Sequence, residues 1–422
     1  MANVLVVGIA KSGICASRLL RKRRDTVFIT DIKDDKVTRS AAQRLIREGV
    51  VKRSNAELGA HTEKLVKKCG LVIVSPGVRP DALPVALAEK MGIPVISELE
   101  LGYSMCPSRV IAVTGTSGKT TTATLIGQML KASGRDAVVC GNIGNPFTGE
   151  IDRLKKDSLV VVEASSFQLE RIDKFKPRVS VILNISTNHL DRHADMNEYI
   201  SAKLRIFLNQ DENDVTLLNK GDELLNEIAE AVKGPRVEFF DEYGGFGKRC
   251  GVENEDFLAA MSGASLMGAS EEKMLEVIRA FKGIEHRLEH VASVKDIHFI
   301  NDSKATTISS VEWALRSLDP GIVLIMGGRY KGGDFGALKG LVRDKVDRVI
   351  AIGEARPNIR QGLDGVTEIF EAGDLSEAVE EAFKKARKNG RVLLSPGCSS
   401  FDMFKNYEER GNVFKRIVQG LK

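Results

Sequence analysis

The sequence predicts an α/β protein whose sheets are largely parallel. Short, continuously apolar segments rich in β-branched residues recur along the chain, and helical patterns separate many of them. Strands buried on both faces have this composition, and intervening helices carry the chain from one parallel strand to the next. The apolar segments are residues 4–7, 27–30, 71–74, 159–162, 181–183, 322–326, 349–352 and 392–394.

Three units follow one another along the chain. The first opens with a strand, a glycine turn and a helix, which favours a Rossmann-like domain. The second contains a phosphate-binding loop and is expected to resemble P-loop ATPases, with an irregular glycine-rich stretch at residues 239–251. The third is expected to be Rossmann-like and to end with a helix from about Lys405. The expected domains are residues 1–96, 97–283 and 284–422.

The bulk composition is that of a folded protein with reduced thiols. The 422 residues are 43% hydrophobic and 28% charged, and the six scattered cysteines form no CxxC pair. No apolar run is long enough to span a membrane, and no signal-peptide pattern opens the chain, so a cytoplasmic location is expected. A monomer is also expected. The net charge of +5 suits an anionic ligand. The basic run at residues 21–24 closes a predicted helix, which argues against nucleic-acid binding.

The clearest motif is a phosphate-binding loop between an apolar strand and a helix, residues 120–132. Such a loop surrounds phosphate oxygens with backbone N–H groups, while its lysine reaches the β/γ-phosphates and its threonine binds Mg²⁺. Val113 occupies the position of the usual first glycine, so a chance glycine turn is the alternative. The motif predicts use of a nucleoside triphosphate and consists of Gly115, Thr116, Ser117, Gly118, Lys119, Thr120 and Thr121.

Three further residues of the second unit are candidates for metal chemistry. Glu163 directly follows an apolar strand and could hold Mg²⁺, although a helix-capping role is the alternative. His189 lies in the polar loop 184–193 and could ligate a second metal or act as an acid or base; a hydrogen-bonded spectator is the alternative. Lys203 lies on an amphipathic helix, where a solvated lysine is the default expectation.

The first unit carries a weak dinucleotide signal. Gly8 and Gly13 flank a turn of the Rossmann type, and Asp31 ends the second strand, where it could contact a ribose. Ala10 replaces the middle glycine of the fingerprint, so a turn without a ligand is equally plausible from the motif. An oxidoreductase using this unit is therefore the alternative from another enzyme class, and Lys119 of the second unit argues against it.

Polar loops follow three strands of the third unit. They comprise residues 301–306, 327–331 and 395–400, and loops at the carboxyl ends of parallel strands share one edge of a sheet. Lys304, Lys331 and Ser400 would together suit a substrate that bears carboxylates. Each of them alone fits an exposed surface residue, so the prediction depends on their common position.

In combination, these motifs resemble the Mur ligases of peptidoglycan precursor synthesis over nearly the whole chain. The resemblance implies three domains, for a UDP-linked sugar, for ATP and for an amino acid. It also implies an ADP-forming amide ligase that proceeds through an acyl phosphate and adds D-glutamate to UDP-N-acetylmuramoyl-L-alanine. The alternative is a related ligase with another UDP-linked acceptor or amino acid, as in archaeal pseudomurein synthesis. The motifs are residues 59–64, 75–77, 141–144, 165–168, 189–193, 301–306 and 404–411.

The resemblance also implies roles for individual residues. Two Mg²⁺ ions would be held by Thr120, Glu163, His189 and a carbamoylated Lys203, which with Lys119 form the catalytic set. The nucleotide would also contact His286, Arg287 and Asp302. The UDP-linked substrate would contact Lys11, Ser12, Asp31, Ile32, Ser75, Gly77 and Asn142. The amino acid would contact Lys304, Thr306, Lys331, Ser400 and Tyr407.

Two departures from the family pattern concern the metal and the nucleotide. Asn188 stands where the family usually has an aspartate before the metal-binding histidine. Residues 252–256 replace a His-Asn-x-x-Asn stretch that normally contacts the adenine. These changes bear on metal binding and on nucleotide preference.

Overall fold

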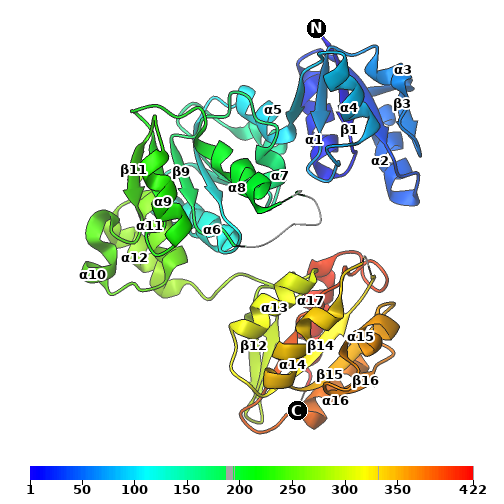
Figure 1. Cartoon of the computed structure of the whole chain (residues 1–422), viewed down its shortest axis with the longest axis vertical. Helices are drawn as coiled ribbons and strands as arrows, with labels where there is room; N and C mark the ends of the chain where they lie inside the picture. The colour runs from blue at the N-terminus through cyan, green and yellow to red at the C-terminus, as the bar shows by residue number, and fades with distance from the viewer. Residues whose placement is uncertain (187–192, 194, 331, 422) are drawn as a thin grey trace. The chain divides into compact units, whose positions relative to one another are not determined.

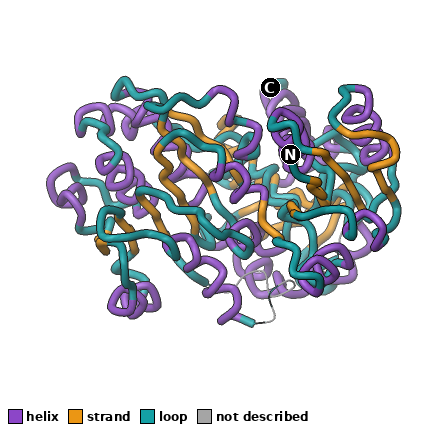
Figure 2. Tube along the Cα trace, turned by 90° about the horizontal axis from the view of Figure 1, so that it is seen from above, coloured by secondary structure: helices purple, strands orange, loops and turns teal. Residues whose placement is uncertain are grey.

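The computed structural model describes residues 1–186, 193, 195–330 and 332–421 (Figure 1). The chain forms two compact units, Met1–Ala280 and Phe281–Lys422. The first unit contains two separate sheets and the second contains one. Orange strands alternate with purple helices along the trace in Figure 2, which confirms the predicted α/β class. Among the described residues, no helix is long and apolar enough to cross a membrane.

The N-terminal sheet has five parallel strands in the order β3-β2-β1-β4-β5. This order reverses between β1 and β4, and ligands of open α/β sheets bind at such a point. The strands are β1 (Asn3–Val7), β2 (Thr26–Asp31), β3 (Val51–Leu58), β4 (Leu71–Val74) and β5 (Val95–Ser97). The helices are α1 (Lys11–Lys22), α2 (Lys36–Arg47), α3 (Glu63–Val66), α4 (Leu83–Lys90) and α5 (Glu98–Ser104).

The central sheet has six parallel strands in the order β11-β10-β9-β6-β8-β7. They are β6 (Arg109–Thr114), β7 (Ala137–Gly141), β8 (Leu159–Glu163), β9 (Val179–Ile182), β10 (Val215–Leu218) and β11 (Arg236–Phe239). The helices are α6 (Lys119–Ala132), α7 (Ser166–Leu169), α8 (Met196–Leu204), α9 (Glu223–Ala231), α10 (Phe246–Cys250), α11 (Glu255–Leu266) and α12 (Glu271–Ala280), with 3₁₀ turns η1 (Phe147–Gly149), η2 (Ile151–Arg153), η3 (Arg205–Phe207) and η4 (Tyr243–Gly245). The prediction of an irregular stretch at residues 239–251 is wrong in part, because α10 and η4 form there.

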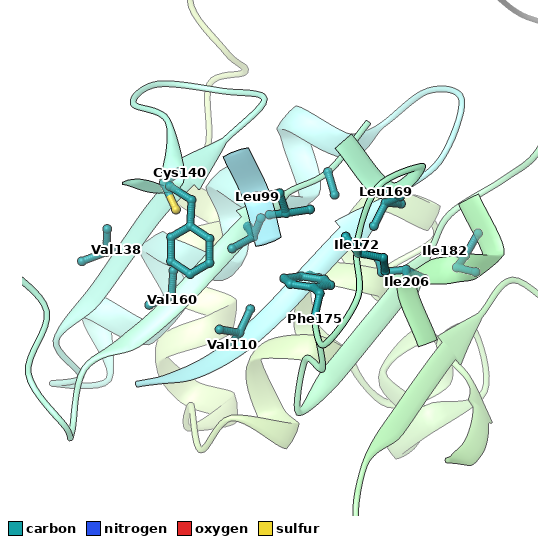
Figure 3. Close-up of a cluster of buried hydrophobic side chains, with 14 of the residues drawn as sticks. Leu99, Val110, Val138, Cys140, Val160, Leu169, Ile172, Phe175, Ile182 and Ile206 are labelled. Carbon is teal, nitrogen blue, oxygen red and sulfur yellow. The ribbon is translucent and has the colours of Figure 1, made fainter. Parts of the chain in front are cut away.

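One face of the central sheet is covered by a continuous hydrophobic core (Figure 3). Val110, Val160 and Ile182 project from neighbouring strands, and Phe175 and Leu99 pack over them. Burial of each such side chain contributes about 1.5–3 kcal/mol to the free energy of folding. This core holds β6, β8 and β9 side by side, so the loops that follow these three strands share one edge of the sheet.

The sheet of the second unit has the order β12-β13-β17-β14-β15-β16, in which only the β12–β13 pair is antiparallel. The strands are β12 (Glu289–Val294), β13 (Ile297–Asn301), β14 (Ile322–Gly327), β15 (Val346–Ile352), β16 (Glu368–Glu371) and β17 (Arg391–Leu394). The helical segments are α13 (Ile308–Arg316), η5 (Phe335–Leu338), α14 (Lys339–Lys345), α15 (Arg356–Leu363), α16 (Leu375–Lys385) and α17 (Tyr407–Gln419). Because β13, β17 and β14 are neighbours, the three polar loops after them do share one edge, as predicted.

Candidate active site

The phosphate-binding loop connects β6 to α6 through two glycines with left-handed or near left-handed backbones. Gly115 has φ +153° and Gly118 has φ +77°. A Cβ on Gly118 would also lie 2.1 Å from Oδ1 of Asp256, so no larger residue fits there without a shift. Val113, at the position of the missing first glycine, lies inside β6 and has no positive φ, so this position does not require glycine.

Lys119 folds back over the loop that precedes it. Its ammonium Nζ donates to the carbonyl oxygens of Gly115 and Thr116, at 2.8 Å each. The ammonium group therefore lies beside the backbone N–H groups at the start of α6. A cation and N–H donors in this arrangement bind phosphate oxygens.

Asn184 supports the loop from the end of β9 and was not singled out from the sequence. Its side-chain Oδ1 accepts from the backbone N–H groups of Thr116 and Ser117, at 3.1 and 2.9 Å. The sequence feature that could have identified Asn184 is its position, as a polar residue directly after an apolar segment that was expected to form a strand. Asn184 holds two of the loop's N–H groups in one orientation, and both point at an acceptor oxygen.

Glu163 ends β8 and is almost completely buried, with 1% of its surface exposed. One carboxylate oxygen accepts from the Thr120 hydroxyl at 2.9 Å, and the other accepts from the Asn142 amide at 2.7 Å. The structure thus brings together two residues that were predicted as Mg²⁺ ligands. Hydroxyl and carboxylate oxygens are the donors that Mg²⁺ prefers, so this pair fits the ion.

Lys203 lies on α8 and is buried, with 2% of its surface exposed, so the default expectation of a solvated lysine is wrong. Its Nζ donates to the Gly115 carbonyl oxygen at 2.7 Å and lies 4.6 Å from the centre of the Tyr199 ring. Burial, and then the charge of Lys119, lower the pKa of Lys203 well below its usual value. The helical period alone could not reveal this burial, because part of the cover comes from Gly115 of the phosphate loop, which is distant in sequence.

His189 lies outside the described residues, as do Asn188 and Lys331. Within the described part of the chain, no group of three or more His, Cys, Asp or Glu side chains is arranged to hold a metal ion. The described part of the predicted metal set is therefore Thr120, Glu163 and Lys203.

Two of the candidate UDP-site residues, Asp31 and Ser75, support the turn between β1 and α1. Asp31 accepts from the backbone N–H groups of Ile9 and Lys33, both at 2.9 Å, so its carboxylate shapes this turn. Ser75 donates to the Gly8 carbonyl oxygen at 2.8 Å, which ties β4 to the same turn. The other candidates are half-buried Ser12, exposed Lys11, Ile32 and Gly77, and Asn142 beside Glu163.

The nucleotide candidates of the second unit surround the end of β13. Asp302 is buried, accepts from the Ser395 hydroxyl at 2.8 Å, and has its pKa raised by burial to about 7. His286 is buried with φ +65°, and its Nδ1 lies 2.9 Å from the Asn301 amide nitrogen. Burial lowers the pKa of His286. Arg287 is exposed, so its guanidinium is the member of this set that solvent reaches.

The described amino-acid candidates occupy the loops after β13 and β17 and the start of α17. Lys304 and Thr306 are half-buried, and the Lys304 ammonium lies 5.7 Å from the centre of the Tyr407 ring. Ser400 is buried in the loop after β17. A lysine beside an aromatic ring and hydroxyl groups could bind a carboxylate and orient it.

Comparison with known proteins reveals similarity over the whole chain. Residues 2–97 match the family description "Mur ligase MurD-like, N-terminal domain", residues 113–270 match "Mur ligase middle domain", and residues 286–398 match "Mur ligase, glutamate ligase domain". UDP-N-acetylmuramoylalanine–D-glutamate ligase of Geotalea uraniireducens is 40% identical, covering 99% of this chain and 97% of that protein. The enzyme of the same name from Caldicellulosiruptor bescii is 39% identical, with 99% and 98% covered.

Solved structures share the fold at low sequence identity. The UDP-N-acetylmuramate-alanine ligase MurC of Thermotoga maritima has a TM-score of 0.59 and 19% identity, with both chains covered completely. A pseudomurein peptide ligase type C of Methanothermus fervidus has a TM-score of 0.56 and 19% identity, also with complete coverage. At such identities the likeness extends to the three-domain α/β fold.

Proposed function

This chain belongs to the Mur ligase family, and on that premise we propose that it is an ATP-dependent ligase that joins D-glutamate to UDP-N-acetylmuramoyl-L-alanine. The observation that carries this proposal is the 40% identity, over 99% of the chain, to a UDP-N-acetylmuramoylalanine–D-glutamate ligase. The Thr120–Glu163 pair beside the phosphate loop supports the use of ATP.

In the proposed reaction, a carboxylate oxygen of the UDP-linked substrate attacks the γ-phosphorus of ATP. The bond from that phosphorus to the β,γ-bridging oxygen breaks, and ADP leaves. The amine of D-glutamate then attacks the acyl carbon, loses a proton and expels phosphate. Lys119 and the loop N–H groups hold the triphosphate and stabilise the negative charge that moves during phosphoryl transfer.

The metal assignment builds on the buried oxygen donors. Mg²⁺, when bound, would neutralise phosphate charge and align the reacting oxygens. We assign Thr120 and Glu163 to one ion, and His189 together with Lys203 to a second. The hydroxyl and carboxylate of the first pair are 2.9 Å apart, with Asn142 orienting the carboxylate from its other oxygen.

Lys203 is proposed to react with carbon dioxide. A buried lysine with a lowered pKa has a neutral fraction whose nitrogen is nucleophilic. That nitrogen would attack the carbon of CO₂ and release one proton, leaving an anionic carbamate. The product would replace a cation beside Lys119 with oxygen donors for Mg²⁺.

The three expected domains are assigned one substrate each. Residues 1–96 would bind the UDP-linked sugar with help from Asn142, residues 97–283 would bind ATP, and residues 284–422 would bind the amino acid and contribute His286, Arg287 and Asp302 to the nucleotide. An acidic amino acid suits the positive charge that Lys304 and Lys331 supply. The protein is proposed to act as a cytoplasmic monomer.

Phosphate release tests the proposal directly. We expect release only when ATP, Mg²⁺, the UDP-linked acceptor and D-glutamate are all present. The matched controls are L-glutamate, alanine and lysine as amino acids, and UDP-N-acetylmuramate as acceptor. Efficient turnover with alanine or lysine and none with D-glutamate would reject the substrate while keeping the ligase class. Reduction of a nicotinamide cofactor would favour an oxidoreductase.

A further inference from the structure

Arg410 is the largest fully buried side chain of the described structure, with 0% of its surface exposed. It lies on α17 of the second unit and has no assigned role. A guanidinium has five N–H donors in a rigid plane, and burying it without an anionic partner is unfavourable. Among the described residues, Arg410 forms no ion pair, and its hydrogen bonds go to neutral oxygens; the Asp402 carboxylate acts on it from beyond ion-pair distance. Burial lowers the pKa of Arg410 to about 10.

The guanidinium bridges two of the polar loops that were predicted to bind the amino acid. Nε donates to the Ser303 hydroxyl at 3.0 Å, and Nη2 donates to the Ser303 carbonyl at 2.8 Å. Nη1 donates to the Cys398 carbonyl at 3.1 Å. Ser303 directly precedes Lys304, and Cys398 lies two residues before Ser400. One rigid group therefore links the loop after β13 to the loop after β17, in addition to the Ser395–Asp302 hydrogen bond and the backbone bond from Gly397 N to the Ala305 carbonyl oxygen.

Backbone contacts extend this arrangement to the loop after β14. Arg329 N donates to the Ser399 carbonyl oxygen at 2.8 Å. This hydrogen bond attaches the loop after β14 to the loop after β17. A Cβ on Gly328 would lie 2.3 Å from the same Ser399 oxygen and 3.3 Å from Nη1 of Arg410. Glycine is thus required where the third loop passes the guanidinium.

We propose that Arg410 is a positioning residue for the amino-acid site, holding the loops that carry Lys304 and Ser400 at a fixed separation. This inference rests on the proposed function, because those loops are assigned there to the amino acid. A packing role alone would need only apolar volume, which methionine supplies without the desolvation of a charge. The planar fork is what lets one side chain reach both loops at once.

The test compares Arg410→Lys with Arg416→Met in the full-length protein. Arg416 is exposed on the same helix, so its variant controls for the loss of an arginine from α17 outside the bridge. An ammonium has all its donors on one nitrogen, whereas the bridge starts from three separate guanidinium nitrogens. Small displacements of binding groups lower rates steeply. We expect Arg410→Lys to raise the KM for D-glutamate about tenfold or more, with the KM values for ATP and the UDP-linked acceptor changing less than about twofold. A KM for D-glutamate within about twofold of wild type, in a folded variant, would overturn the proposal.

Ser303→Ala provides a milder variant in case Arg410→Lys does not fold. It removes the hydroxyl that accepts from Nε and donates to the Tyr407 carbonyl at 2.8 Å, while its own carbonyl still accepts from Nη2. We expect a selective rise in the KM for D-glutamate of about three- to tenfold. A rise shared equally by all three substrates, or no rise, would contradict a positioning role.

Hydrogen–deuterium exchange separates failure of this inference from failure of the proposed function. If wild type ligates no amino acid, the proposed function fails, and exchange of the backbone amides at residues 302–306 and 396–400 decides the role of Arg410. Faster exchange there in Arg410→Lys but not in Arg416→Met would support the bridge. Equal exchange in all three proteins would refute it.

Discussion

The phosphate-binding loop and the polar loops of the second unit are built in different ways. The first is a contiguous strand, loop and helix whose backbone N–H groups form the binding surface. The second brings together loops nearly 100 residues apart, and one buried arginine bonds to both of them, at Ser303 and at the Cys398 carbonyl. A contiguous loop depends on local backbone geometry, whereas an assembled site depends on tertiary contacts. The predictions below test this contrast.

Removal of the Lys203 amine should have the largest effect. Lys203→Ala removes both the hydrogen bond to the Gly115 carbonyl and the proposed carbamate, so we expect a loss of kcat of about 10³-fold. Lys203→Arg should be equally impaired, because a guanidinium does not form the carbamate. Kinetics with added formate or acetate should show partial recovery only in Lys203→Ala. Normal turnover of Lys203→Arg would refute the role.

Removal of the Lys119 charge should have the next largest effect. Lys119→Ala loses the cation of the phosphate loop, and we expect kcat/KM to fall about 10²-fold, by analogy with loss of one transition-state contact. Lys131→Ala, exposed at the last turn of the same helix, is the matched control and should behave as wild type. Full activity of Lys119→Ala would show that the loop does not hold the triphosphate.

Asn184 tests whether the phosphate loop needs tertiary support. Asn184→Ala frees the N–H groups of Thr116 and Ser117 from their shared acceptor, and a less ordered loop should raise the KM for ATP about tenfold. Exposed Asn213 provides the control variant Asn213→Ala. A lower KM for ATP would instead mean that Asn184 competes with phosphate for these groups.

Asp302 should make the stability of the second unit depend on pH. Its folded pKa of about 7 lies above its unfolded value, so the folded state binds more protons between about pH 4 and 7. Its contribution to the free energy of unfolding therefore falls as pH rises through this window, by up to ~4 kcal/mol. The only tryptophan, Trp313, reports on this unit by fluorescence during denaturation. Asp302→Asn should flatten the pH dependence, and an unchanged pH slope would contradict the assignment.

The sequence predicted the strands well where they were short, apolar and flanked by turns. It predicted β8 at residues 159–162 and the structure has Leu159–Glu163, so even the position of Glu163 at the strand end was close. The strand before Asn301 was predicted, but its hairpin partner β12 was missed, because the turn between them uses Lys295 and Asp296 with positive φ rather than glycine. Turn residues that tertiary contacts hold in an unusual conformation leave no clear local signal.

What the sequence determined by itself was the set of features that depend on neighbouring residues. The phosphate loop is one of them, because strand, glycines and helix N-terminus lie within about 20 residues and their geometry is local. The tertiary structure alone decided that Lys203 is buried against Gly115 and that Arg410 joins Ser303 to Cys398. Burial and pairing across distant segments depend on which strands become neighbours in a sheet, and a helical or strand period does not record that choice.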